Sequence, residues 1–196
     1  MTKLTVGAVT GGGSEWVPLT SGTISDNFTL DVSTYTGGTY EDLKLSLRSI
    51  EIDTDNRVVG MLLDNGSGVE TGTLYETVWT NLHSSVTTGN KVPIYSTAGN
   101  ANDVPFFVNI GNDADVYHSV DITLLDVSST NTERNGSFKG TAFSSLSDCV
   151  YIEGGWKAEG MNSGVLTGIK IASRLSGSDN GTIDAGSYIL YGRLAL

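Results

Sequence analysis

The chain has 196 residues, 38% of them hydrophobic and 17% charged, which favours one domain with a packed core over a disordered acidic chain. Its net charge of −11 argues against binding to nucleic acid or to an anionic membrane surface, because both depend on lysine and arginine. A single cysteine, Cys149, excludes an internal disulfide framework. With no signal-peptide pattern and no apolar run of roughly 18 residues, we expect a soluble protein made in the cytoplasm.

Residues 1–15 are expected to form a flexible N-terminal arm. The stretch lacks hydrophobic periodicity and contains three consecutive glycines, Gly11, Gly12 and Gly13. Trp16 follows at the start of an apolar stretch and fits a first strand or a hydrophobic anchor. We therefore place a single folded domain at residues 16–196.

Alternation of apolar and polar residues predicts β-strands through the rest of the chain. It begins at residues 28–32 and is strongest at residues 43–47, where three leucines share one face. Ile50 and Ile52 carry the apolar set on the opposite parity, which indicates a bulge near Arg48 and Ser49. A helix over residues 40–52 is the competing interpretation, and the strict alternation argues against it.

Later segments continue the pattern. Asn65-Gly66 is a strong hairpin signal after a short apolar run. Pro105 places the next buried strand at an edge or at a strand beginning. Residues 116–124 alternate in one phase that includes His118. Residues 165–173 and 186–194 are expected to form a closing hairpin whose last strand lies in the middle of a sheet.

In all, the sequence predicts ten to twelve short strands, recurring turns and no convincing helix. This pattern predicts an all-β antiparallel β-sandwich, jelly-roll-like, with a short N-terminal arm.

A search for chemistry gives few candidates. None of the common nucleophile, phosphate-binding or zinc-protease motifs is present. His118 fits a satisfied core residue and His83 a solvated loop residue, so no zinc site of ordinary spacing can be drawn. Asp53, Asp55 and Asp64 match three positions of a calcium loop, but Arg57 stands among the ligands. Asp113 and Asp115 fit a solvated turn better than a cation site. We expect no metal and no cofactor.

Acidic and aromatic residues leave two alternatives open. Four glutamates lie in or near strands and could in principle serve glycoside hydrolysis, although nothing pairs them: Glu41, Glu51, Glu76 and Glu153. Aromatic residues could line a sugar-binding face, or they could fill the core. The aromatic candidates are Trp16, Trp79, Trp156, Tyr75, Tyr117 and Tyr151.

The order of several short motifs resembles a jelly-roll domain of tailed-bacteriophage virion proteins. The match covers about residues 16–194, and the order with a nearly terminal "LYG" matters more than any single motif. The motifs are "WVPL" (16–19), "SDNFTLD" (25–31), "TYEDLKLSLRSI" (39–50), "VVGMLLDNG" (58–66), "LTGIKI" (166–171) and "AGSYILYGRL" (185–194).

The resemblance implies a non-enzymatic virion component, as in capsid decoration proteins, head fibres and tail appendages, often homotrimeric. It implies the major capsid protein or another virion protein as partner, and it carries over no site residue. The small size favours a compact capsid decoration protein located in the virion, with Gly11, Gly12, Gly13 and Trp16 as the docking arm. The alternatives are a tail appendage that recognises host-surface glycan through Trp79 or Trp156, and a lectin-like carbohydrate enzyme.

Overall fold

The structure is a computed structural model, and its regular elements are all β-strands. In the residues it describes there are twelve strands and no helix, hence none long and apolar enough to cross a membrane. The described residues are 15–54, 57–69, 75–84, 91–101, 103–112, 116–130, 133–145, 148–161, 164–174 and 181–194.

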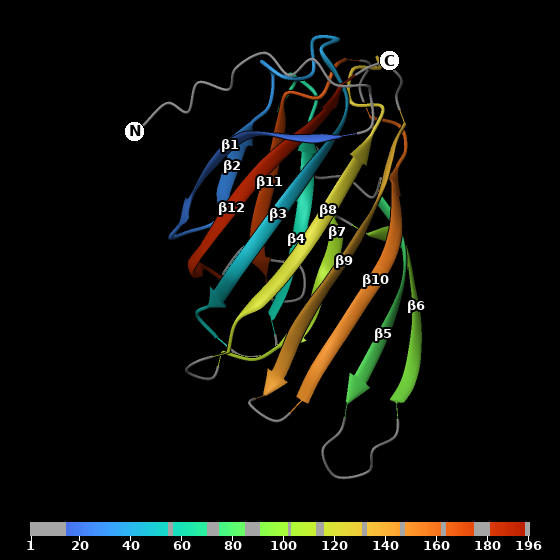
Figure 1. Cartoon of the computed structure of the whole chain (residues 1–196). Coiled ribbons are helices and arrows are strands. Elements are labelled where there is room, and N and C mark those ends of the chain that lie inside the picture. Colours follow the sequence, from blue (N-terminus) through green and yellow to red (C-terminus); the bar gives the residue numbers. More distant parts are fainter. Residues whose placement is uncertain are drawn as a thin grey trace.

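The strands form two antiparallel sheets that pack face to face (Figure 1). The larger sheet has eight strands in the order β1-β12-β3-β8-β9-β10-β5-β6, and the smaller has four in the order β2-β11-β4-β7. The bounds are β1 (Trp16–Ile24), β2 (Phe28–Asp31), β3 (Tyr40–Ile52), β4 (Arg57–Asp64), β5 (Tyr75–Ser84), β6 (Lys91–Ala101), β7 (Val104–Ile110), β8 (His118–Leu125), β9 (Arg134–Ser145), β10 (Asp148–Ala158), β11 (Gly168–Arg174) and β12 (Ile183–Leu194).

The pairing is nested, as in a long hairpin rolled into two layers. β1 pairs with β12, β2 with β11, β3 with β8 and β4 with β7, all antiparallel. This is the topology of a jelly roll. Two further hairpins, β5–β6 and β9–β10, lie outside the nested set and extend the large sheet beyond β8. The predicted all-β, jelly-roll-like sandwich is therefore confirmed.

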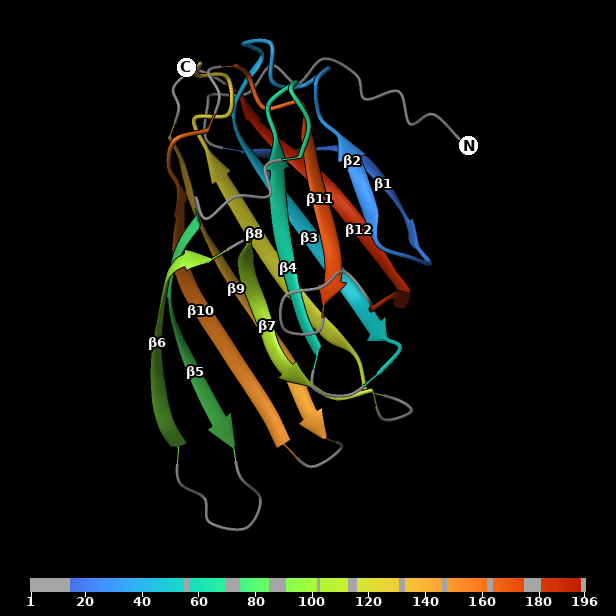
Figure 2. The same cartoon turned by 180° about the vertical axis from the view of Figure 1, so that it is seen from behind.

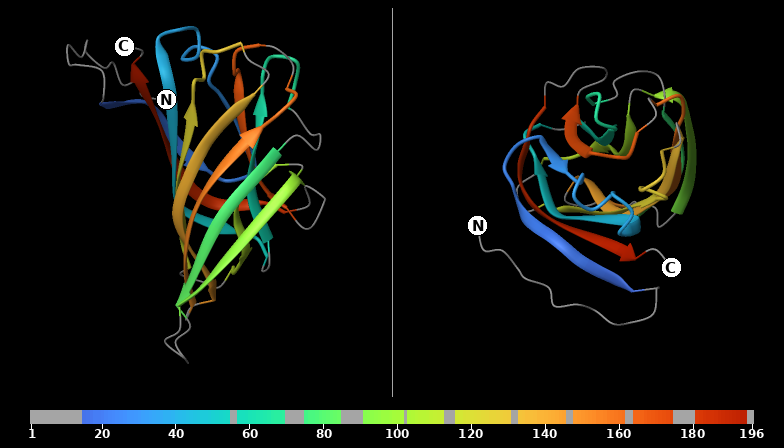
Figure 3. Two further views of the ribbon diagram at one scale, coloured as in Figure 1. Left: turned by 90° about the vertical axis from the view of Figure 1, so that its right-hand side faces the viewer. Right: turned by 90° about the horizontal axis from the view of Figure 1, so that it is seen from above.

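The large sheet curves around the small one, as the view from above shows (Figure 3). The small sheet lies in front in the view from behind, and β5, β6 and β10 reach past its lower end (Figure 2). A hydrogen bond ties the layers together: the Leu63 N–H of β4 donates to the Tyr75 hydroxyl of β5 at 2.9 Å. Tyr75 is fully buried, so β5 contributes to the core.

The predicted closing hairpin is wrong. β11 pairs with β2 and β4 in the small sheet, whereas β12 pairs with β1 and β3 in the large one. The chain crosses between layers after β11, as a jelly roll requires, so the two strands never meet as partners. The prediction that the last strand is central holds, because β12 has a neighbour on each side.

Asn65-Gly66 also lies in a turn, but no strand hairpin follows it in the residues described up to Val69. Gly66 and Gly68 have positive φ values of 92° and 111°, and only an isolated bridge joins Asp64 to Val69. The next strand, β5, belongs to the other sheet. The turn chemistry was predicted correctly, but the pairing it normally signals does not follow.

The predicted bulge near Arg48 and Ser49 is present. Ser49 has a φ of 52°, and the register between β3 and β8 shifts between Leu47 and Ile50. Gly186 lies opposite on β12 with a φ of 154°, where a Cβ would approach the Ile50 Cδ1 to 2.6 Å. The bulge returns Ile50 and Ile52 to the core, which explains the change of parity in the sequence.

In β3 before the bulge and in β8, the alternation of apolar and polar residues matches the alternation of buried and more exposed side chains. The leucines at 43, 45 and 47 and every second residue of β8 from His118 to Leu124 are buried. Pro105 lies one residue into β7, which is an edge strand of the small sheet, as its missing N–H predicts.

His118 joins three segments from inside the core. Its Nε2 lies 3.0 Å from the Gly111 carbonyl oxygen, and its Nδ1 accepts the Phe143 N–H at 3.2 Å. Both contacts require a neutral ring with its proton on Nε2. Burial lowers the pKa of His118 from its ordinary 6.5, although the bond to Gly111 opposes this shift.

Packing around Gly136 leaves no room for a side chain. A Cβ there would lie 1.9 Å from the Thr123 carbonyl oxygen and 2.8 Å from the Trp156 ring. We expect Gly136→Ala to cost about 1–3 kcal/mol or more, as overpacked cores do. Gly155→Ala is the matched control, since its Cβ would meet only the Gly136 carbonyl oxygen at 3.7 Å. Urea unfolding of both variants checks this, and equal stability would contradict the packing account.

Stability should fall as the pH drops through about 6.5. The unfolded state takes up a proton on His118 near that pH, while the folded state resists uptake until lower pH, so folding is favoured above this window and loses stability within it. Unfolding free energies at pH 7.5, 6.5 and 5.5 measure the slope. The His118→Gln variant should be less stable at pH 7.5 but should show a smaller slope, and an unchanged slope would contradict the assignment.

Candidate docking surface

Four side chains gather on the outer face of the large sheet near its β1 edge, and we call them the β1-edge patch: Trp16, Lys44, Tyr191 and Arg193. The register explains the gathering. Arg193 of β12 lies opposite Trp16 of β1, and Tyr191 lies opposite Lys44 of β3. Directly opposed residues share a face, and the adjacent pair Leu190 and Leu45, which has the opposite parity, is buried in the core. The patch therefore points away from the sandwich.

Cation–π contacts organise this patch. The Lys44 Nζ lies 4.6 Å from the centre of the Tyr191 ring and 5.2 Å from that of Trp16. The Arg193 guanidinium carbon lies 5.9 Å from the Trp16 ring centre. All three distances are within the range of such contacts, so two cations rest against half-buried rings in a strongly acidic protein.

A buried carboxylate on the same face of the sheet holds Arg193 of the patch. Asp42 of β3 has a side chain only 3% exposed and forms an ion pair with Arg193. The other oxygen of Asp42 accepts the Asp126 N–H at 2.9 Å, where the turn after β8 has a positive φ. The position of Arg193 is thereby coupled to the β8–β9 turn.

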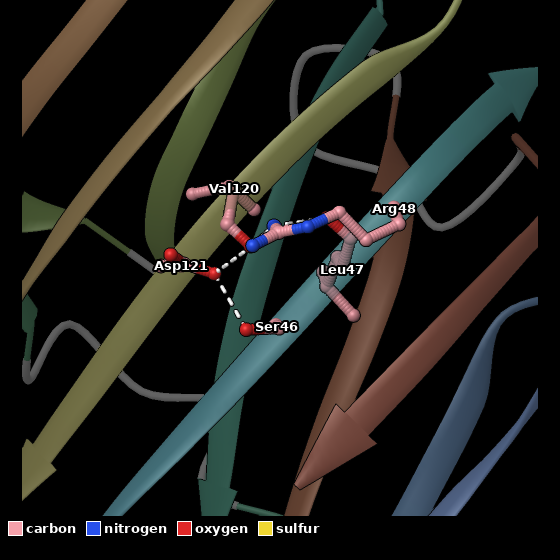
Figure 4. A network of polar contacts seen from close by, with 5 residues as sticks. All are labelled: Ser46, Leu47, Arg48, Val120 and Asp121. Carbon is pink, nitrogen blue, oxygen red and sulfur yellow. Dashed lines mark hydrogen bonds and ion pairs between the residues drawn. The ribbon is translucent and has the colours of Figure 1, made fainter.

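The rest of the outer face carries exposed pairs of opposite charge. Figure 4 shows Asp121 of β8 accepting from Arg48 at 2.6 Å and from Ser46 at 2.5 Å, both on β3. The side chains of Arg48 and Asp121 are 43% and 42% exposed. Solvent-exposed pairs of this kind contribute little to stability. On β10, Lys157 contacts Glu159 and Glu76, and these hydrogen bonds raise its pKa.

The residues proposed for docking are only partly placed. Gly11, Gly12 and Gly13 lie outside the described residues. Trp16 begins β1 and belongs to the β1-edge patch, and the folded part of the described chain starts at this point. Of the two interpretations, first strand or hydrophobic anchor, the first is therefore observed.

The two tryptophans proposed for glycan contact differ. Trp156 is 4% exposed and lies against Gly136 in the core, so this ring has no face open to a sugar. Trp79 lies in β5, paired with Gly154 and Ser96, and its side chain lies outside the described residues. Tyr75 is also buried, whereas Tyr117 is 46% exposed.

Four of the carboxylates weighed for catalysis or metal binding have structural partners. Glu76 contacts Lys157 at 3.1 Å, and Glu153 accepts the Tyr151 hydroxyl at 2.9 Å, both on the outer face of the curved sheet. Asp53 lies 3.5 Å from Arg57, and Asp64 caps its own turn by accepting the Gly66 N–H. In the part of the chain that the structure describes, no group of three or more potential ligands could hold a metal. Asp55, Asp113 and Asp115 lie outside it.

No protein-family model matches the chain, and no curated protein matches it in sequence.

Sequence reasoning singled out Trp16 but missed Lys44, Tyr191 and Arg193. Parity shows that Lys44 faces away from the leucines and that Tyr191 and Arg193 share a face. It does not show that β12 lies between β1 and β3, and only that order brings the three together.

The buried ion pair at the patch should matter far more than an exposed one. We expect Arg193→Met to cost about 3 kcal/mol, because it leaves the buried Asp42 carboxylate without its cation. Arg48→Met is the matched control and should cost less than about 1 kcal/mol. Chemical denaturation of both measures the difference. Adding Asp42→Asn should recover part of the Arg193→Met loss, and a purely additive double variant would contradict the pairing.

Proposed function

We propose that the chain is a non-enzymatic virion structural protein of a tailed bacteriophage that decorates and stabilises the assembled capsid shell. The nested jelly-roll pairing is the observation that carries this proposal, because jelly rolls recur in viral capsid proteins. The resemblance in motif order points the same way. The major capsid protein is the proposed partner, and a homotrimer is the proposed oligomer.

The mechanism is binding. A protein that binds the assembled shell and not its free subunits shifts the equilibrium towards the assembled state. Decoration needs a stable body and a surface that recognises the shell. The rigid two-layer core supplies the first, and the β1-edge patch with the adjoining arm is our candidate for the second. Its half-buried rings can contribute apolar area and its cations can pair with shell carboxylates.

The alternative is a tail appendage that recognises host-surface glycan, since lectins use the same fold. Burial of Trp156 removes one of its two proposed contacts, which leaves Trp79. Cryo-electron microscopy of the source phage with this gene intact and deleted separates the locations. Loss of shell density supports decoration, loss of tail density supports the appendage, and no change contradicts both.

Removal of residues 1–15 should abolish binding to particles that lack the protein while leaving the fold intact. The strands begin at Trp16, so the deletion removes no described strand residue. Co-sedimentation with particles measures binding, and circular dichroism with thermal unfolding confirms the fold.

Lys44→Met in the full chain tests the patch separately and should weaken binding with little loss of stability. Lys139→Met on β9 is its control, because Lys139 is another lysine on the outer face that lies over a tyrosine ring.

For the truncation, normal particle binding by the protein that lacks residues 1–15 would contradict the docking role of the arm.

A further inference from the structure

Within the described residues, the outer edge of β1 is an unpaired and uncharged sheet edge. β1 is the terminal strand of the large sheet there, and the one described strand it pairs with is β12. Unpaired edges readily accept another strand, and proteins usually blunt them with charges, proline or short length. β1 has nine residues, WVPLTSGTI, with no charge, and after Pro18 its remaining residues 19–24 contain no proline.

Among the four described edge strands, β1 is the longest without a charged residue. β2 has four residues and ends on Asp31, β6 begins with Lys91, and β7 is uncharged but has seven residues. β1, β6 and β7 each contain one proline, so the length of the uncharged edge is what distinguishes β1. Something that satisfies its backbone groups is expected, because an exposed edge of this length promotes aggregation.

The sequence just before β1 has the composition of a strand. Residues 2–10 read TKLTVGAVT, with five β-branched residues and no proline, aspartate or asparagine. Leu4, Val6 and Ala8 alternate with Lys3, Thr5 and Gly7. The segment has nine residues, the length of β1, and residues 11–15, GGGSE, separate the two.

We propose that residues 2–10 pair antiparallel with the free edge of β1 in the same chain and so extend the large sheet. A five-residue connection containing three glycines suits a β-hairpin loop. Such a short tether also gives a high effective concentration of the segment at β1, which favours its own chain over a second copy.

The residue pattern agrees with this pairing. A loop of residues 11–15 places Thr10 opposite Trp16, Thr5 opposite Ser21 and Leu4 opposite Gly22. Gly22 lies opposite Tyr188, whose half-buried ring stacks on Phe28 of the small sheet at 5.4 Å. Leu4 and Val6 then lie on the inner face, beside that open side of the core. Thr5 lies on the outer face with the exposed Ser21.

This pairing does not depend on the virion proposal. It also gives the arm a second role, because a partner that binds residues 2–10 has to displace them from β1. The resting protein would then be protected from self-association by the same segment that docks.

Cysteine crosslinking in the full chain tests the pairing. In a Cys149→Ser background, the pair Thr5→Cys with Ser21→Cys should crosslink through a short thiol-reactive linker at the mass of the monomer. The control pair, Thr5→Cys with Thr141→Cys, uses an exposed residue of β9 on the same sheet face, separated from β1 by β12, β3 and β8. A crosslink at the mass of a dimer would assign the edge to a second copy and overturn the proposal. Absence of crosslinking, or equal crosslinking of both pairs, would also overturn it.

Amide hydrogen exchange gives an independent readout that needs no cysteine. Residues 2–10 and β1 should both be protected in the full chain, and Val6→Pro should speed exchange in both by about tenfold or more. Val6→Thr is the control, because it keeps strand propensity and should keep most of the protection. Unchanged β1 exchange in Val6→Pro would contradict the pairing.

Discussion

The two-sided pairing of β12 is the constraint on which the rest of this structure depends. β12 fills the space between β1 and β3, so the last described strand joins the first described strand to the main body of the sheet. Without β12, β1 would lose its connection to β3, and the missing Leu190 would leave a gap in the core beside Leu45. Contacts between strands so distant in sequence favour slow folding, because the loop-closure entropy is lost before these contacts form. The regularity of the C-terminal sequence is explained by this central position.

The sequence was sufficient to predict which face of the most regular strands is buried, but not which strand is the neighbour of each. Alternation placed Leu43, Leu45 and Leu47 in the core, and the change of parity located the bulge at Ser49. The closing hairpin failed because β11 and β12 cross between layers. Alternation reports only local burial, whereas pairing depends on loop-closure entropy and on how two complete sheets pack.

The sequence was also insufficient to identify the buried charge beside the β1-edge patch. The sequence indicated an acidic chain and a prominent Trp16, and it did not distinguish Asp42 from the many exposed carboxylates. Asp42 is buried where the Asp126 N–H donates to one of its oxygens and Arg193 forms an ion pair with the other. Arg193 then compensates the buried charge and also reaches Trp16. A buried ion pair of this type is weak evidence of stabilisation, but it orients the side chains that it holds.

The fold places the free edge of β1 next to the proposed docking surface. A jelly roll leaves its first strand at a sheet edge, and here the two inserted hairpins lengthen the opposite end of the same sheet. The edge is therefore distant from the β5–β6 hairpin and adjacent to the aromatic rings and two cations of the β1-edge patch, and the arm precedes it directly in sequence. A surface that must be protected in the free protein and exposed on a partner needs an occupant that can be exchanged. In the proposed pairing, residues 2–10 meet that requirement, because their contacts with β1 would be mainly backbone hydrogen bonds that another strand can replace.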